Sequence, residues 1–127
     1  MKKLLLLTLL VLPAWAELPP LSPEERLQQS SRVVVAKIGP VRQLRVDGGK
    51  DATKIIYTAS AQVQSVVKGN GLKVGDTIDC TYWKAGERPR GWVGPGGQYQ
   101  PLAPNTVVKL YLQADNQLIN PNGWEKP

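Results

Sequence analysis

The sequence predicts a mainly β domain, a small five-stranded barrel, closed or partly closed, with one short N-terminal helix. Three observations lead to this prediction. Apolar side chains recur at every second position in several segments, which is the period of a half-buried strand. Gly, Pro, Asn and Asp gather between those segments, as they do in turns. The first strand segment is long and is interrupted by Gly39-Pro40, and five antiparallel strands that begin in this way are typical of small barrels.

The expected helix follows a Pro-rich lead-in. Ser22 can cap the helix, Pro23 suits the first helical position, and Glu25 completes a capping box with Ser22. We expect the helix to end near Ser31. Leu27 is its one strongly apolar residue, which predicts a short helix lying on the surface of the domain.

The strand signal begins at Arg32 with a run of β-branched residues, as in a strand buried on both faces. Gly39-Pro40 predicts a bulge or sharp bend, so this segment is either one long bent strand or two short strands meeting at a corner. Trp124 either docks to close the barrel or belongs to a disordered tail. The other strands are expected at residues 54–67, 77–83, 106–114 and 117–120.

The N-terminus has the three parts of a cleavable signal peptide. Two lysines precede an apolar run at 4–12, and Ala14 and Ala16 supply small residues at the −3 and −1 positions of a cleavage site. We expect cleavage before Glu17, which divides the chain into a signal peptide at 1–16 and a single domain at 17–127. The product is expected to be exported, either periplasmic or secreted. Beyond the signal peptide, no apolar segment is long enough to span a bilayer.

The amino-acid composition limits the kinds of catalysis and metal binding that the protein can support. Sixteen basic residues face ten acidic ones, and loss of the two lysines in the signal peptide leaves fourteen against ten. This mild positive charge is weak evidence for an anionic partner. The chain has no histidine, which excludes Ser-His and Cys-His nucleophile pairs and any His-ligated metal. We therefore expect no cofactor and no metal, and we favour a non-catalytic role. A hydrolase using Asp79 and Glu87 is the alternative from another class; the other interpretation is that both acids are solvated surface charges.

Cys80 is the one cysteine, so no internal disulfide is possible. Ile78 and Tyr82 share its strand face, which predicts a small buried core residue. A reactive thiol and an intermolecular disulfide are the alternatives.

Several segments together resemble a known family. The runs R-V-V-V-A-K-I-G-P-V, A-Q-V-Q-S-V-V-K-G, G-D-T-I-D-C and V-V-K-L-Y-L, with a Gly/Pro-rich loop before the last, are similar to secreted netrin-like domains. These are OB-type barrels found in tissue inhibitors of metalloproteinases and in uncharacterised bacterial exported proteins. The resemblance covers Arg32 to Ile119 and implies an OB-type fold. It does not imply metalloproteinase inhibition, because the animal inhibitors act through an N-terminal cysteine and several disulfides, whereas the predicted first residue here is Glu17.

The long segment 84–105 lacks periodicity, and such loops are often functional. Basic and aromatic residues alternate on it. Aromatic faces stack on sugar rings or bases, and Arg and Lys pair with anionic groups. The alternative is that Trp83 and Trp92 fold back to plug a barrel end. The candidate ligand-binding residues are Lys84, Arg88, Arg90, Trp92 and Tyr99.

The sequence therefore predicts an exported, non-catalytic binding or interaction module with an unknown protein or glycan partner. A sharper alternative is a binder of oligosaccharides or cell-wall glycans. Nucleic acid is the less favoured partner, because an exported protein meets little of it and the net charge is modest.

Replacing Arg88, Arg90 and Trp92 together by alanine is expected to abolish binding of the protein to its ligand while the protein stays folded, because the change removes the charged and stacking groups of the loop. Pull-down on peptidoglycan and on anionic glycans at low salt measures the effect. Unchanged retention of a folded triple mutant contradicts the loop as contact surface.

Overall fold

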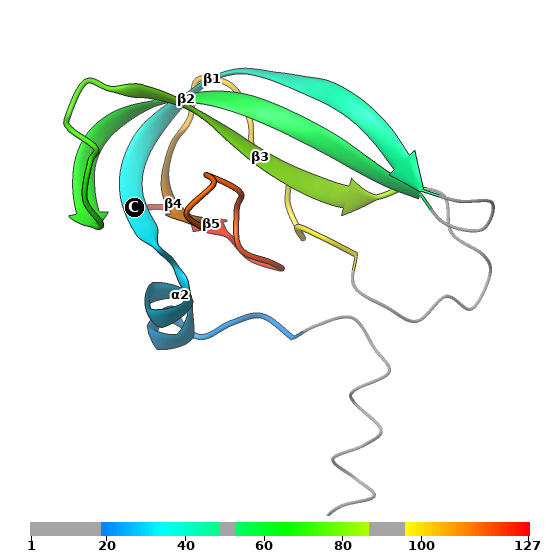
Figure 1. The fold of residues 1–127 in the computed structure, drawn as a ribbon, viewed down its shortest axis with the longest axis horizontal. Coiled ribbons are helices and arrows are strands. Elements are labelled where there is room, and N and C mark those ends of the chain that lie inside the picture. Colours follow the sequence, from blue (N-terminus) through cyan, green and yellow to red (C-terminus); the bar gives the residue numbers. More distant parts are fainter. Residues whose placement is uncertain (1–18, 49–52, 87–95) are drawn as a thin grey trace, which may run out of the picture.

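A computed structural model of the protein describes residues 19–48, 53–86 and 96–127. Its five strands form one antiparallel sheet in the order β3-β2-β1-β4-β5, which confirms the mainly β class (Figure 1). The predicted cleavage residues Ala14, Ala16 and Glu17 lie outside the described residues. The elements, in chain order, are α2 (Pro23–Gln29), β1 (Arg32–Gly48), β2 (Thr53–Lys68), β3 (Thr77–Ala85), β4 (Val107–Leu112) and β5 (Trp124–Glu125).

The predicted capping box is present at the start of α2. The Ser22 hydroxyl accepts a hydrogen bond from the Glu25 N–H at 3.1 Å, and the Glu25 carboxylate accepts one from the Ser22 N–H at 3.0 Å. The hydrogen bond from the Ser22 N–H, followed by the interaction with the Ser22 hydroxyl, lowers the pKa of the Glu25 carboxyl group, because both favour its charged form. The helix ends at Gln29, where the sequence predicted an end near Ser31.

An arginine, not a leucine, anchors α2 to the sheet. Leu27 is 42% exposed, whereas Arg26 is only 8% exposed. The Arg26 guanidinium forms an ion pair with Glu125, donates to the Asn122 carbonyl at 3.3 Å and lies 4.8 Å from the centre of the Tyr111 ring. The Tyr111 hydroxyl donates to Glu125 at 2.9 Å. Burial, followed by the charge and hydrogen bond of Glu125, raises the pKa of the Tyr111 phenol. Polar contacts thus join the helix to the C-terminal strand.

The first strand is continuous and bent, so of the two sequence alternatives the single long strand is confirmed. Ile38 pairs with Ala61 and Val41 pairs with Ala59, so Gly39 and Pro40 together oppose Ser60 alone. Two residues against one define a β-bulge, which bends a strand and increases its twist. A Cβ atom on residue 39 would lie 2.6 Å from the Ser60 hydroxyl oxygen, so glycine lets the two strands approach here without displacing that hydroxyl.

The two halves of β1 have different surroundings. Residues 33–37 pair with β2 on one side and with β4 on the other, and Val33 and Val34 are completely buried there. Beyond the bulge, β1 pairs with β2 alone among the described strands. Leu44 is 47% exposed and Val46 is 53% exposed in this half. The change of neighbours at the bulge explains why the buried run ends there.

Of the closed and partly closed barrels that the sequence allowed, the closed one is not formed, because the sheet is not closed. β3 and β5 are its two edges. Segment 116–118 lies between β3 and β4 and makes single bridges: the Thr81 N–H donates to Asn116 O at 3.1 Å, and the Leu118 N–H donates to Thr81 O at 2.9 Å. The predicted strand at 117–120 does not form, since the chain soon reaches Pro121, which has no N–H for a ladder. The fifth strand is Trp124–Glu125, paired with β4.

The core lies on the concave face of the curved sheet and follows the predicted alternation. Ala59, Ala61 and Val63 are at most 1% exposed, while Ser60 and Gln62 between them face the other way. We call this opposite side of the sheet the outer face. The core consists of Val34, Ala36, Ile38, Ala59, Ala61, Val63, Cys80, Tyr82, Leu102, Val108, Leu110, Leu112 and Leu118.

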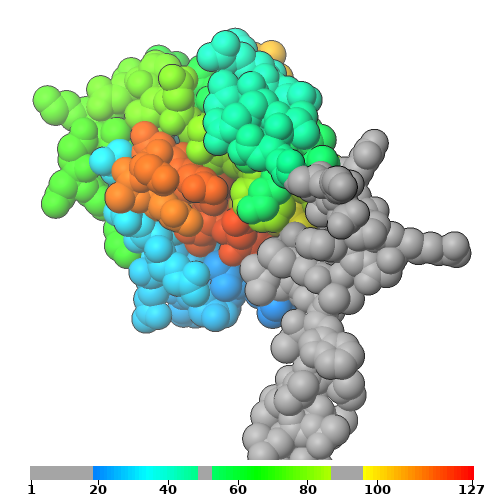
Figure 2. All heavy atoms as spheres, turned by 45° about the vertical axis from the view of Figure 1, so that its right-hand side comes forward, coloured from blue at the N-terminus to red at the C-terminus, as the bar shows by residue number. Residues whose placement is uncertain are grey.

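A buried glutamine holds the C-terminal segment against the sheet. Gln98 is 2% exposed; its amide nitrogen donates to the Ile119 carbonyl and to the Asn120 side chain, and its amide oxygen accepts from the Gly123 N–H at 2.8 Å. Trp124 packs against the core, which confirms the docked alternative for this residue. Figure 2 shows the C-terminal residues, in orange and red, between the green sheet and the blue helical region.

Replacing Gln98 by alanine is expected to lower the free energy of unfolding by about 3 kcal/mol, because three buried partners lose their hydrogen bonds. Urea denaturation measures the change. Gln113→Ala is the matched control, since Gln113 is exposed, and we expect it to cost less than about 0.5 kcal/mol. Equal stability of the two variants would show that the amide does not hold the segment.

Candidate functional site

The structure describes the two ends of the predicted contact loop. The Lys84 ammonium donates to the backbone carbonyls of Gln98 at 3.0 Å and of Tyr99 at 3.2 Å, so this cation braces the returning arm of the loop. Tyr99 is 37% exposed. The other predicted ligand-binding residues, Arg88, Arg90 and Trp92, lie outside the described residues.

Trp83 is an anchor for this loop. It is 8% exposed and therefore buried, but the sheet is not closed, so the predicted plugging of a barrel end is not found. The Trp83 carbonyl accepts a hydrogen bond from the Gln98 N–H at 2.9 Å, and a Cβ on Gly97 would lie 2.2 Å from the same oxygen. The Lys54 ammonium lies 4.4 Å from the centre of the indole ring. Trp83 therefore serves packing on the outer face, opposite to the side of Tyr82.

The acids named for a hydrolase do not form a described pair. Asp79 is exposed on β3, and Glu87 lies outside the described residues. The Asp76 carboxylate accepts from the Lys73 N–H at 2.9 Å and so belongs to a turn. Within residues 19–48, 53–86 and 96–127, no three His, Cys, Asp or Glu side chains are grouped as metal ligands. In the same ranges, no helix has both the length and the apolar character needed to cross a bilayer.

Cys80 belongs to the core. Its side chain has no exposed surface, which confirms the buried interpretation. Burial raises the pKa of the thiol to about 12, because the apolar surroundings disfavour the charged thiolate. Since the thiolate is the nucleophile, this cysteine is chemically inert in the folded protein.

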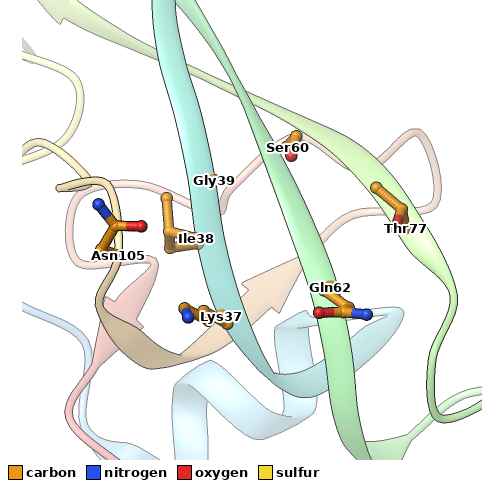
Figure 3. A pocket seen from close by; sticks show the side chains of 7 residues that line it. All are labelled: Lys37, Ile38, Gly39, Ser60, Gln62, Thr77 and Asn105. Carbon is orange, nitrogen blue, oxygen red and sulfur yellow. The ribbon is translucent and has the colours of Figure 1, made fainter.

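A polar groove lies on the outer face where β1 bends (Figure 3). It has a volume of about 330 Å³. Three of its lining residues form a row across three neighbouring strands. Lys37 lies opposite Gln62, and Gln62 lies opposite Thr77 on the next strand. Ser60 stands one rung further along, against the bulge. The lining residues are Lys37, Ile38, Gly39, Ser60, Gln62, Thr77 and Asn105.

The loop before β4 brings Asn105 to this groove. Asn105 has a φ of 64°, in the left-handed region that asparagine tolerates better than most residues. Its N–H donates to Ile38 O at 2.7 Å, and the Ile38 N–H donates to Thr106 O at 2.8 Å. This pair of hydrogen bonds ties the loop to β1 directly before the bulge.

The polar side chains that line the groove do not take part in hydrogen bonds that stabilise the described fold. Within the described part of the chain, none of the five makes a side-chain hydrogen bond to another residue. Gly39 adds no side chain, and its backbone lies close to the Ser60 hydroxyl on the neighbouring strand. Ammonium, hydroxyl and carboxamide groups together offer many donors and several acceptors in a small area. The five residues are Lys37, Ser60, Gln62, Thr77 and Asn105.

Sequence reasoning did not single out these residues. Two signals for them were present: the polar alternate positions of the 54–67 strand, and the Gly39-Pro40 interruption. Their combination needed the pairing of Gly39-Pro40 with Ser60, which joins residues about twenty positions apart.

Comparisons of the chain with family models, curated proteins and solved structures find no match. The resemblance to netrin-like domains therefore stays a prediction.

The Cys80 thiol is expected to react with an aromatic disulfide reagent about a thousandfold more slowly in the folded protein than in denaturant at pH 8, because exposure requires unfolding. Absorbance of the released thiolate measures both rates. The unfolded sample is the control for reagent activity. Rapid labelling of the folded protein contradicts the buried, protonated thiol.

Proposed function

We propose that the protein is a non-catalytic binding module that binds an oligosaccharide in the polar groove of its outer face. The main support for this proposal is that five polar side chains line one groove and have no side-chain hydrogen-bond partners in the described fold. Sugar hydroxyls both donate and accept, and a mixture of amide, hydroxyl and ammonium groups complements them.

The scaffold supports this role. Lys37, Gln62 and Thr77 stand on three neighbouring strands and are themselves paired across the sheet, so their backbones are held in place before a ligand arrives. A site on strands is positioned more rigidly than one on loops. Pre-positioned groups lose less conformational entropy on binding.

Binding is favoured over hydrolysis by the lining of the groove. Among the residues that the structure describes, no Asp or Glu lines it, and glycoside hydrolysis commonly uses a pair of carboxyl groups at the scissile bond. The predicted signal peptide supports the glycan class, since it would deliver the protein to a compartment where cell-wall glycans occur. The loop with Arg88, Arg90 and Trp92 stays a second predicted contact surface.

The double variant Gln62→Ala, Thr77→Ala is expected to bind oligosaccharides about tenfold more weakly, because two hydrogen-bonding groups are lost. Titration with chitohexaose, with oligogalacturonate and its methyl ester, and with peptidoglycan fragments, followed by NMR, measures affinity and locates the perturbed amides. Gln64→Ala is the matched control, because Gln64 is exposed two residues further along β2 and does not line the groove. Absence of binding to all of these probes, or equal weakening by the control, contradicts the groove as a glycan site.

A further inference from the structure

The outer face carries a row of basic residues that continues from the groove. Even-numbered residues of β2 share this face with Ser60 and Gln62. Their partners on β1 are therefore on it too: Lys37 lies opposite Gln62, Arg42 opposite Thr58 and Arg45 opposite Ile56. Lys54 and its partner Asp47 complete the row. The row runs along the bent strand past the groove.

Two of these cations have partners within the protein. The Arg45 Nε donates to both carboxylate oxygens of Asp47, at 3.1 and 3.0 Å. Lys54 lies over the Trp83 ring. Their charges are therefore partly satisfied by neighbouring groups.

The other two cations are available to a ligand. Lys37 and Arg42 are exposed, and neither has a side-chain partner among the residues that the structure describes. Lys37 lines the groove, and Arg42 is the next outer-face side chain of β1 after the Gly39-Pro40 bulge. The two cations thus stand on either side of the bend.

The position of Asp79 determines on which side of the groove an anionic ligand can bind. Asp79 is exposed and pairs with Ser60, so its carboxylate shares the outer face on the β3 side of the groove. Its charge repels an anionic ligand there, while Lys37 and Arg42 attract one on the β1 side. The charges across the groove are therefore asymmetric.

Building on the proposed oligosaccharide site, we infer that its ligand is an acidic oligosaccharide whose carboxylate groups are bound along β1 by Lys37 and Arg42. The hydroxyl groups of the same chain contact Ser60, Gln62 and Thr77 in the groove. Charge complementarity selects this class over neutral sugars, because the two cations offer charge-assisted hydrogen bonds that a neutral sugar cannot use fully.

The test compares one sugar chain in two charge states. The wild-type protein is titrated with oligogalacturonate and with its methyl ester, which keeps the chain and removes the negative charge. We expect the acid to bind about tenfold more tightly at low salt. The preference should shrink as salt rises, because salt screens exposed charges over about 10 Å at 0.1 M.

Three variants then locate the charge. Arg42→Gln is expected to weaken binding of the acid about fivefold and leave binding of the ester unchanged. Asp79→Asn is expected to strengthen binding of the acid about twofold, since it removes a repulsion. Arg45→Gln is the matched control on the same strand face; because Asp47 already occupies Arg45, its effect should be smaller than that of Arg42→Gln.

The outcomes separate this inference from the proposed function. Equal binding of acid and ester by the wild type leaves the oligosaccharide site standing and overturns the acidic ligand. Loss of binding to both probes in Arg42→Gln, with the fold intact, also overturns it, because the residue would then act on the sugar chain in general. Absence of binding to either probe and to the other glycans contradicts the oligosaccharide site itself.

Discussion

The pairing of β1 with β2 through the Gly39-Pro40 bulge is the constraint on which the rest of the molecule depends. Before the bulge, β1 has a neighbour on each side, and its alternate residues can be buried completely. After the bulge, β1 keeps β2 alone among the described strands and its side chains meet solvent. Glycine favours the change, because a Cβ at residue 39 would displace the Ser60 hydroxyl. The polar groove lies at this transition, so the feature that bends the sheet also positions the candidate site.

The open side of the sheet is covered by polar contacts in place of a further ladder. Gln98 holds the C-terminal segment by three hydrogen bonds, and Arg26 joins α2 to Glu125. Buried polar groups are tolerated where partners satisfy them. The partners of Gln98 lie in segment 119–123, outside the regular strands, and Arg26 pairs with Glu125 of β5, whereas the buried Arg26 Nε has no partner among the described residues. Cys80 forms no disulfide within this single chain, so packing and these hydrogen bonds hold the fold. The same contacts leave the outer face uncovered where the groove lies.

The sequence predicted the separate features of the candidate site but not their combination in one groove. Alternation in the second strand placed Ser60 and Gln62 on a polar face, and the Gly39-Pro40 pair indicated a bend. The loop residues drew attention because basic and aromatic side chains alternate there, yet Lys84 is bonded to the backbone of its own loop and Trp83 is buried. The composition shows which chemical groups the side chains of a protein supply. Whether a group is available to a ligand depends on the contacts that the fold has already made with it.

The sequence by itself determined the mainly β class, the capped helix, four of the five strands and the burial of Cys80, because capping and alternation are properties of neighbouring residues. The tertiary structure decided that the sheet stays open, that the last strand is Trp124–Glu125, and that Arg26 is the buried residue of α2. Each of these rests on a contact between distant positions: Thr81 with Leu118, Lys109 with Glu125, and Arg26 with Glu125. Local periodicity fixes which face of a strand is apolar. The choice of partner for that face is made only when the whole chain has folded.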